Sequence, residues 1–562
     1  MARKTKEKWE FGDFQTPLPL AEAAVGTLRR TGIDPRSVLE PTCGKGAFLL
    51  AEIQTFPRAQ LYVGVDVNPK HLAALEPRVL ASSRPDGIEL IQEDFFQLNW
   101  DVLLAELPQP LLILGNPPWV TSSELALLQS ANVPSKSNFQ QRRGYDAITG
   151  KSNFDISEWM LLQHLEWLKD RRGTIAVLCK AAVARKVLLH AWQHQFPVAS
   201  SSMFMVDAQK HFGVSVNACF LVIDLFQGSQ SIDCAVYNAL DSARPSQTIG
   251  YHDAIVFSNV ARYSKWRHLN GTDHAYTWRS GIKHDCSKVM ELELEGNEYR
   301  NAMGELTALE DDYVYPMLKS SDIGNGQIRY GRKYMLVTQK YVGEDTDPIK
   351  RTAPRTWRYL EAHSELFEKR GSSIYRNRPT YSIFGVGDYS FSGWKVVISG
   401  FYKRLSFQVV EPFRDKAVVL DDTTYFLPCW SASEARFVAG LVNSEAALQF
   451  YESMIFWSDK RPITVEILKR LDLHALSREL GCEPEYQNFA KRRKDHEMEN
   501  AHGQLSLGIT QRRAKYVVNE GGIYQVAAAD APKDGLPLSS VFGVVEVAQP
   551  KQLRANGKRF ST

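Results

Sequence analysis

The sequence predicts an α/β protein, with a largely parallel sheet in its N-terminal part and a mixed α+β arrangement in its C-terminal part. Between residues 38 and 226, short apolar runs alternate with helical patterns, as they do in parallel α/β domains. Beyond residue 278, β-prone segments at 396–400 and 417–420 precede helical stretches at 432–451 and 463–473. A chain of 562 residues is also too long for one hydrophobic core, so we expect several domains.

The predicted elements of the first part follow one another in order. The strands are expected at 37–40, 61–65, 88–92, 111–115, 173–178 and 218–225, with helices between them that include 47–55 and 156–168. After residue 226 the alternation gives way to shorter strands and polar loops. We therefore expect a domain at 1–226, a connector at 227–278, a second domain at 279–475 and a polar extension at 476–562.

The composition is that of an ordinary globular protein, with 44% hydrophobic and 23% charged residues. No apolar run reaches the roughly 18 residues that a membrane-spanning helix needs, and the basic N-terminus lacks the apolar stretch of a signal peptide. Seven scattered cysteines without a CxxC pair argue against a zinc site or a disulfide framework. We expect a cytoplasmic protein that needs no metal.

Positive charge is concentrated in one region, although the net charge of the chain is only +3. Residues 319–416 contain 18 Lys and Arg against 10 Asp and Glu, and tyrosines and tryptophans lie between them. Basic side chains neutralise phosphates and aromatic rings stack on bases, so this region predicts contact with DNA or RNA. The alternative is a solvated charged face over an aromatic core.

The apolar run 111–115 is followed at once by Asn116-Pro117-Pro118-Trp119. Asn116 offers a side-chain carbonyl oxygen, while the two prolines stiffen the backbone and remove two N–H donors. The loop is therefore rich in hydrogen-bond acceptors and lies next to a large ring. Such a loop suits a planar group with an NH2, such as the amino edge of a nucleobase. A simple turn after a strand is the alternative.

Three other predicted strands end in residues suited to an adenosine-containing cofactor. Gly44 and Gly46, in Glu40-Pro41-Thr42-Cys43-Gly44-Lys45-Gly46, allow a tight turn close to a ligand. Asp66 ends the second strand, where it can accept hydrogen bonds from ribose hydroxyls. Asp94 and Phe95 follow the third strand, where an acid can accept from an adenine amino group and a ring can pack on the purine. The features of a phosphate-binding loop are missing, so S-adenosylmethionine (SAM) fits best, with solvated loop carboxylates as the alternative for each acid.

Together with residues 116–119, this series resembles the gamma class of SAM-dependent DNA amino-methyltransferases, which methylate adenine N6 in restriction–modification systems. Thr16-Pro17 matches the segment that precedes the glycine turn in that class, and Phe212 matches an aromatic residue that packs on the flipped-out base. Trp119 replaces the commoner Tyr, and 153–159 matches the corresponding helix start only loosely. The resemblance covers roughly residues 11 to 226.

The resemblance implies a Rossmann-like SAM-binding domain followed by a target-recognition domain, which the basic region would form. It implies catalytic roles for Asn116, Pro117, Pro118 and Trp119, and base binding by Phe212. The residues that it implies for SAM binding are Thr16, Glu40, Pro41, Cys43, Gly44, Gly46, Asp66, Asp94 and Phe95.

The implied reaction is transfer of a methyl group from SAM to N6 of a flipped-out adenine in double-stranded DNA. A separate restriction endonuclease or another subunit of a defence system is an implied partner. Cytosine N4 stays open as the target, since the same loop could serve it. Two other hypotheses for the function also stay open: a protein or RNA amino-methyltransferase, and a non-catalytic DNA-binding subunit of a defence complex.

Overall fold

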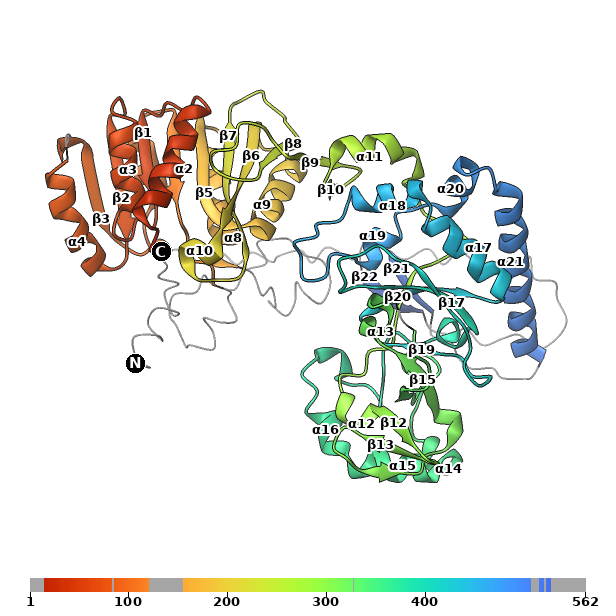
Figure 1. Cartoon of the computed structure of the whole chain (residues 1–562). Helices are drawn as coiled ribbons and strands as arrows, with labels where there is room; N and C mark the ends of the chain where they lie inside the picture. The colour runs from red at the N-terminus through yellow and green to blue at the C-terminus, as the bar shows by residue number, and fades with distance from the viewer. Residues whose placement is uncertain are drawn as a thin grey trace, which may run out of the picture. The chain divides into compact units, whose positions relative to one another are not determined.

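The computed structural model describes residues 15–82, 85–120, 155–326, 328–506, 515–519 and 522–526 (Figure 1). Strands and helices alternate along the first part of the chain. Its strands are β1 (Ser37–Glu40), β2 (Leu61–Asp66), β3 (Ile88–Gln92), β4 (Leu111–Gly115), β5 (Gly173–Lys180), β6 (Val198–Asp207), β7 (Asn217–Leu225), β8 (Asp233–Tyr237), β9 (Gln247–His252) and β10 (Ile255–Phe257). Its helices are α2 (Leu18–Arg30), α3 (Ala47–Thr55), α4 (Pro69–Leu80), α5 (Trp100–Glu106), α8 (Ile156–Leu168), α9 (Ala181–Gln193) and α10 (Ala208–Phe212), with a 3-10 turn η1 (Pro85–Gly87).

Ten of the described strands form one sheet, in the order β10-β9-β8-β6-β7-β5-β4-β1-β2-β3. Strands β3, β2, β1, β4 and β5 run parallel, and β7 lies antiparallel between β5 and β6. All six strands predicted from the sequence are present, so the predicted α/β fold is confirmed. The sequence patterns do not predict β6, because three consecutive serines at 200–202 interrupt its apolar residues.

Helices cover the parallel strands on both faces. Every residue of β1 and of β4 is buried, as expected for strands packed on both sides. Leu112 and Leu114 share one hydrophobic cluster with residues of α2, α3 and α4. Helices α8 and α9 contact β5, and their buried residues lie outside that cluster. The strand ends of the site are therefore held by a core on each side of the sheet.

The second part of the chain combines short helices with two smaller sheets. Its strands are β11 (Arg279–Ser280), β12 (Glu291–Glu295), β13 (Glu298–Asn301), β14 (Leu306–Thr307), β15 (Val314–Leu318), β16 (Lys333–Leu336), β17 (Trp394–Ser399), β18 (Gln408–Val410), β19 (Val419–Leu420) and β20 (Thr424–Cys429). Its helices are α11 (Val260–Trp266), α12 (Ser287–Met290), α13 (Ser320–Gly324), α14 (Ile349–Thr352), α15 (Pro354–Ala362), α16 (Ser364–Glu368), α17 (Ala432–Val442), α18 (Glu445–Glu452), α19 (Val465–Leu468), α20 (Leu473–Glu479) and α21 (Glu483–Ser506). The 3-10 turns are η2 (Arg267–Leu269), η3 (Asp311–Tyr313), η4 (Ser373–Tyr375) and η5 (Asp388–Phe391).

The two sheets have the orders β11-β20-β17-β18 and β14-β13-β12-β16-β15-β19. The pairings are antiparallel, except that β19 lies parallel to β15. Strands β21 (Lys515–Asn519) and β22 (Gly522–Val526) form a separate antiparallel pair. The mixed α+β character predicted beyond residue 278 is present.

Two predicted helical stretches differ from the structure in detail. The stretch 432–451 is interrupted, because Ser444 caps a new helix by accepting a hydrogen bond from the backbone N–H of Ala447 at 3.3 Å. The helix predicted over 463–473 is wrong for most of its length, since only Val465–Leu468 is helical before α20 begins. Asp472 caps α20 through its carboxylate, which accepts from His474 N and Ala475 N. Local side-chain capping therefore sets these boundaries.

The predicted domain boundaries stay predictions, although two structural features bear on them. Strands β8, β9 and β10 arise from the predicted connector 227–278 and extend the first sheet. The boundary between residues 475 and 476 falls within α20.

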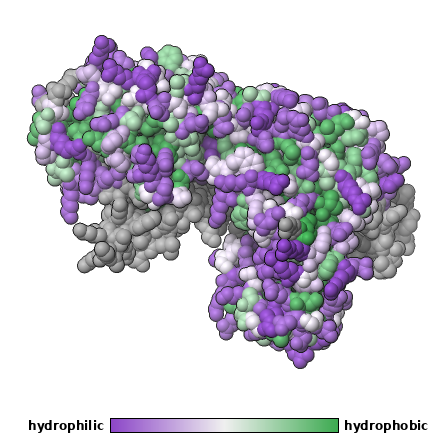
Figure 2. Space-filling view, viewed as in Figure 1, coloured by the Kyte–Doolittle hydropathy of each residue, from purple (hydrophilic) through white to green (hydrophobic). Residues whose placement is uncertain are grey.

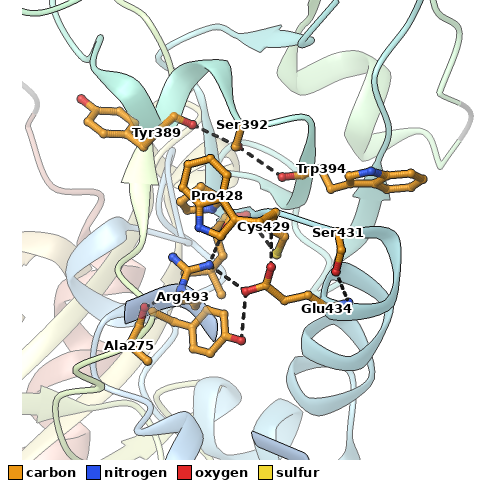
Figure 3. A network of polar contacts seen from close by, with 12 residues as sticks. Ala275, Tyr389, Ser392, Trp394, Pro428, Cys429, Ser431, Glu434 and Arg493 are labelled. Atoms are coloured by element: carbon orange, nitrogen blue, oxygen red, sulfur yellow. Dashed lines mark hydrogen bonds and ion pairs between the residues drawn. The ribbon is translucent and has the colours of Figure 1, made fainter. Parts of the chain in front are cut away.

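Helix α21, from the predicted polar extension, is held by a buried ion pair (Figure 3). The Arg493 guanidinium lies 2.8 Å from the carboxylate of Glu434 on α17, and both side chains are almost fully buried. The same guanidinium donates to the backbone carbonyls of Ala275 and Pro428 at 2.9 and 2.8 Å. The hydroxyl of Tyr276 donates to Glu434 at 3.2 Å. The network therefore links three chain segments to the first half of α21.

This ion pair gives a stability prediction. Arg493→Met should lower the free energy of unfolding by about 3–5 kcal/mol, because it leaves the Glu434 carboxylate buried without its charge partner. Chemical denaturation followed by circular dichroism measures the change. The neighbouring Arg492 is exposed on the same helix, so Arg492→Met should change the free energy by no more than about 0.5 kcal/mol. Equal stability of the two variants would contradict the role given to Arg493.

Candidate active site

The predicted site residues follow neighbouring strands whose carboxyl ends lie at one edge of the sheet. Strand β1 pairs in parallel with β2 and with β4, and β2 pairs in parallel with β3. The glycine turn after β1, Asp66 at the end of β2, Asp94 after β3 and Asn116 after β4 are therefore brought to the same edge. Ligands of open α/β sheets bind at this edge.

The glycine turn needs both of its glycines. Gly44 and Gly46 have φ values of +53° and +72°, in the left-handed region that glycine tolerates best. A Cβ on Gly46 would also lie 2.3 Å from the side chain of Leu75. The backbone N–H of Gly44 donates to the Asp66 carboxylate at 2.8 Å, and the N–H of Lys45 donates to the Gln15 side chain at 2.9 Å. The turn is thus tied both to β2 and to the segment before α2.

The Asp66 carboxylate holds the glycine turn and the residues that follow β2. Its Oδ2 accepts the hydrogen bond from Gly44, while its Oδ1 accepts from Asn68 N at 2.8 Å and lies 3.2 Å from His71 Nδ1. A carboxylate has about four acceptor positions, so these three contacts, counted among the described residues, leave one for a ligand hydroxyl. Together with the close backbone approach that the glycines allow, this donor and acceptor set fits the ribose of an adenosine cofactor such as SAM.

Glu40 and Cys43 lie inside the domain. The Glu40 carboxylate is buried and accepts a hydrogen bond from Leu49 N at 3.1 Å. Burial raises the pKa of Glu40, and the neighbouring charge of Glu52 raises it further. Burial, followed by the charge of Glu40, also raises the pKa of the Cys43 thiol. Glu40 thus holds the start of α3, and Cys43 is a buried thiol rather than a nucleophilic thiolate.

Asp94 and Phe95 take two different positions. The Asp94 carboxylate accepts a hydrogen bond from Phe96 N at 2.9 Å and closes the turn after β3. The ring of Phe95 is buried against Trp100 and Trp167, with ring centroids 5.0 and 5.6 Å apart. Phe95 therefore belongs to an aromatic cluster, and its role in packing on the cofactor stays a prediction.

His164 is part of this cluster, and sequence reasoning gave it no role. Its ring centroid lies 6.2 Å from that of Phe95 and 4.9 Å from that of Trp167. Burial lowers the pKa of His164 to about 3, so its ring is neutral. No periodic or motif signal marks a histidine of this kind.

Residues from other parts of the chain hold the Asn116-Pro117-Pro118-Trp119 loop in place. The Asn116 amide donates to the Thr16 hydroxyl at 3.3 Å, and the Trp119 indole N–H donates to the carbonyl of Leu178 at 3.3 Å. The rings of Trp119 and Phe212 meet edge to face, with centroids 5.3 Å apart and planes at 66°. The structure therefore brings Thr16, Asn116, Trp119 and Phe212 together, although they are far apart in the sequence.

The basic region separates into exposed charges and inward-facing rings. Arginines and lysines at 329, 332, 376, 378, 403 and 404 are exposed, whereas Tyr334, Tyr359 and Tyr381 are buried in a hydrophobic cluster. Most of the surface visible over α14 and α15 is hydrophilic (Figure 2). The exposed cations can meet phosphates, while these three tyrosines stabilise the core. This arrangement agrees with the alternative of a charged face over an aromatic core.

Among the described residues, no helix is long and apolar enough to cross a membrane. The same residues contain no group of three or more His, Cys, Asp and Glu side chains placed to hold a metal ion.

Comparison with known proteins gives one relative that covers most of the chain. The chain is 40% identical over 473 residues to the type II methyltransferase M.NspV from a Nostoc species, across 84% of this chain and 98% of that protein. A second relative, the type II methyltransferase M.XamI from Xanthomonas campestris pv. amaranthicola, is 31% identical over 116 residues, or 20% of each chain. No protein-family model matches the chain.

Among solved structures, the type IIL restriction–modification enzyme MmeI in complex with DNA has a similar fold. The TM-score is 0.50 at 13% sequence identity, and the match covers 83% of this chain and 65% of the MmeI chain. The chain thus spans less than two thirds of the length of MmeI.

The buried acid pair behind the glycine turn gives a pH-dependent prediction. Glu52 is fully buried, and neither carboxylate oxygen has a hydrogen-bond partner among the residues that the structure describes. Burial raises its pKa. A carboxyl whose pKa rises on folding binds its proton more tightly in the folded state, so stability falls as pH rises through the raised value.

Glu52→Leu should therefore stabilise the protein by about 1–3 kcal/mol at pH 8 and by less at pH 5, because lower pH favours the protonated form that the buried site tolerates better. Denaturant unfolding at the two pH values measures this difference. Glu76 is an exposed acid on α4, and Glu76→Leu should show no such pH-dependent gain. A gain for Glu52→Leu that is equal at both pH values would contradict the prediction.

Proposed function

Since this chain belongs to the type II methyltransferase family, we propose that it transfers a methyl group from SAM to the N6 amino group of an adenine flipped out of double-stranded DNA. The observation that carries this proposal is the placement of Asn116 and Trp119 at the same sheet edge as Gly44 and Asp66. The Asn116–Trp119 loop, which offers hydrogen-bond acceptors and a large ring, therefore lies next to Gly44 and Asp66, whose arrangement suits adenosine. In this proposal the chain is a gamma-class enzyme.

Adenine N6 is a poor nucleophile, because its lone pair is delocalised into the ring. In the proposed reaction the side-chain oxygen of Asn116 and the carbonyl of Pro117 accept hydrogen bonds from the amino group. These bonds localise the lone pair and orient the amino group, which is electrostatic and positional catalysis. When bound, SAM supplies the electrophilic methyl group. The reaction needs no covalent intermediate, and the buried Cys43 thiol, with its raised pKa, is unsuited to form one.

The base has to leave the duplex to reach this loop, which costs a few kcal/mol. Stacking on Trp119 offsets part of this cost, with Phe212 as a second aromatic contact. The half-buried Trp119 ring is held by the carbonyl of Leu178. Its orientation is therefore set before a base arrives, so little side-chain ordering accompanies stacking.

DNA as the substrate has two independent supports. The MmeI structure, which has a similar fold, is a complex with DNA, and the relative that covers most of this chain is a type II methyltransferase. The exposed arginines and lysines of residues 319–416 supply charge for phosphate contacts. We propose residues 1–226 as the catalytic domain and 279–475 as the target-recognition domain, and a separate restriction endonuclease as the partner of the modification activity.

A labelled-methyl assay tests the proposal directly. The full chain, incubated with tritiated SAM, should label unmethylated duplex DNA and leave RNA and protein unlabelled. Nucleoside analysis of the product should yield N6-methyladenine. N4-methylcytosine would change the target base and keep the loop chemistry, whereas labelled RNA or protein would overturn DNA as the substrate.

Asn116→Ala should lower the rate of methyl transfer by about 100-fold or more, as the loss of other preorganised polar groups does. SAM binding should be retained. Single-turnover assays with calorimetry of SAM binding measure the two effects. Asn116→Asp keeps an acceptor oxygen and should retain more activity than Asn116→Ala. Near-wild-type turnover in the alanine variant would remove Asn116 from the catalytic role.

Asp66→Ala should weaken SAM binding by about 10- to 100-fold, the cost of losing hydrogen bonds to a charged group. DNA binding should change little, since Asp66 lies next to the glycine turn that is proposed to bind SAM. Calorimetry with SAM and fluorescence anisotropy with duplex DNA measure the two affinities. Glu89, an exposed acid on the adjacent strand β3, serves as the control. Unchanged SAM affinity in folded Asp66→Ala would exclude Asp66 from the cofactor site.

A further inference from the structure

Lys180 makes a pair of contacts beside the Asn116–Trp119 loop that the proposed reaction does not assign. It is the last residue of β5 and directly precedes α9. Its ammonium donates to the backbone carbonyl of Trp119 at 3.0 Å and to the carboxylate of Asp155 at 2.6 Å. One side chain therefore links the end of the loop to the N-terminus of α8.

The loop depends on contacts of this kind. Pro117 and Pro118 have no backbone N–H, so the loop has few donors with which to hold its own shape. Asn116 contacts Thr16 and the Trp119 ring contacts Leu178 through side-chain N–H groups. Lys180 holds the Trp119 backbone through its carbonyl, and it comes from the neighbouring strand rather than from the loop.

Asp155 gives Lys180 a fixed position. The side chain of Asp155 is 8% exposed, and its Oδ1 caps α8 by accepting from the backbone N–H and the hydroxyl of Ser157. Its Oδ2 takes the Lys180 ammonium. A buried carboxylate that loses its cation is strongly disfavoured, so the pair constrains both side chains. Next to the pair, Ile156 N donates to Val120 O at 2.9 Å and joins the same two segments.

We infer that Lys180 is a positioning residue for methyl transfer, which fixes the Asn116–Trp119 loop by bridging the Trp119 carbonyl to the Asp155 carboxylate. This inference rests on the proposed function for its effect on the reaction, and on the contacts themselves for its effect on the loop. Lys180 acts through Trp119 and Asp155. The Lys180 side chain is 27% exposed, so contact with a DNA phosphate is the competing role that the test has to separate.

The matched control is Lys186, on the first turns of α9. Its ammonium pairs with the Glu158 carboxylate of α8 at 2.6 Å. Lys186→Met therefore removes a nearby ion pair, between α9 and α8, without removing a described contact of the loop. Lys180→Met removes both the ion pair and the contact to Trp119.

The experiment uses the full chain labelled with 5-fluorotryptophan, in which Trp119→Phe assigns the Trp119 fluorine resonance among the 12 tryptophans. Lys180→Met should shift or broaden the Trp119 resonance and lower the single-turnover rate on unmethylated genomic DNA by about 10- to 100-fold. Affinities for SAM and DNA should stay unchanged. Lys186→Met should leave the resonance and the rate as in the wild type.

Each other outcome has a defined meaning. An unchanged Trp119 resonance in folded Lys180→Met overturns the inference, as does an equal effect of Lys186→Met. Weaker, less salt-dependent DNA binding with an unchanged resonance would assign Lys180 to a phosphate instead and also overturn it. If Lys180→Met does not fold, Lys180→Arg keeps the charge with a different donor geometry. Its folded form must then shift the resonance and lower the rate, and wild-type values would overturn the inference.

The proposed function fails separately. A wild-type chain that transfers no methyl to DNA would overturn that function, while the Trp119 resonance of the Lys180 variants still decides whether Lys180 holds the loop.

Discussion

Parallel pairing of β4, β1, β2 and β3 is the constraint on which the rest of the site depends. Backbone hydrogen bonds between parallel strands bring their carboxyl ends to one edge of the sheet. Site residues that are spread from Glu40 to Asn116 in the sequence therefore lie close together in the fold. The central strands can pair in this way because helices cover both faces of the sheet and every residue of β1 and β4 is buried. The hydrophobic core thereby sets the position of the polar residues at its rim.

Side chains from neighbouring elements then hold the loops at this edge. Asp66 on β2 holds the glycine turn after β1, and Lys180 on β5 holds the loop after β4. Thr16, before α2, contacts Asn116. Each loop is thus held by a residue of another element, which suits a site whose geometry has to exist before its ligands bind.

The sequence predicts much of the fold because its apolar runs mark the strands: β4 is a continuous buried apolar run, and β1, β3 and β4 all have the predicted bounds. The sequence does not predict β6, because consecutive serines break its apolar pattern. It also does not predict the helix break before Ser444, because the side chain of Ser444 caps a new helix there. Arg493 lies in a basic run, and its burial depends on tertiary contacts with Glu434 and two backbone carbonyls. Composition alone therefore predicts a surface charge at this position.

The candidate site divides in the same way. Asn116, Asp66 and the two glycines lie at predicted strand ends, where the type of residue indicates the chemistry. Lys180 lies two residues beyond the predicted strand 173–178 and is the last residue of the observed β5. A single lysine at such a position has no sequence pattern that distinguishes it from a solvated one. The two acceptors of Lys180, at 119 and 155, become neighbours only when α8 packs beside the sheet.

The contact between Trp119 and Phe212 limits how a base could bind in the proposed reaction. Their rings already meet edge to face, so in this arrangement the two residues do not leave room for a base between them. A base that stacks on Trp119 therefore has to use the face that Phe212 does not cover, or Phe212 has to move. Phe212 lies at the end of α10, a short helix followed by Gly213 in the left-handed region, whereas Trp119 is fixed through its indole N–H and its carbonyl. Of the two residues, Trp119 is thus the one held by two hydrogen bonds to other elements, which makes its ring the better-fixed surface for the proposed stacking.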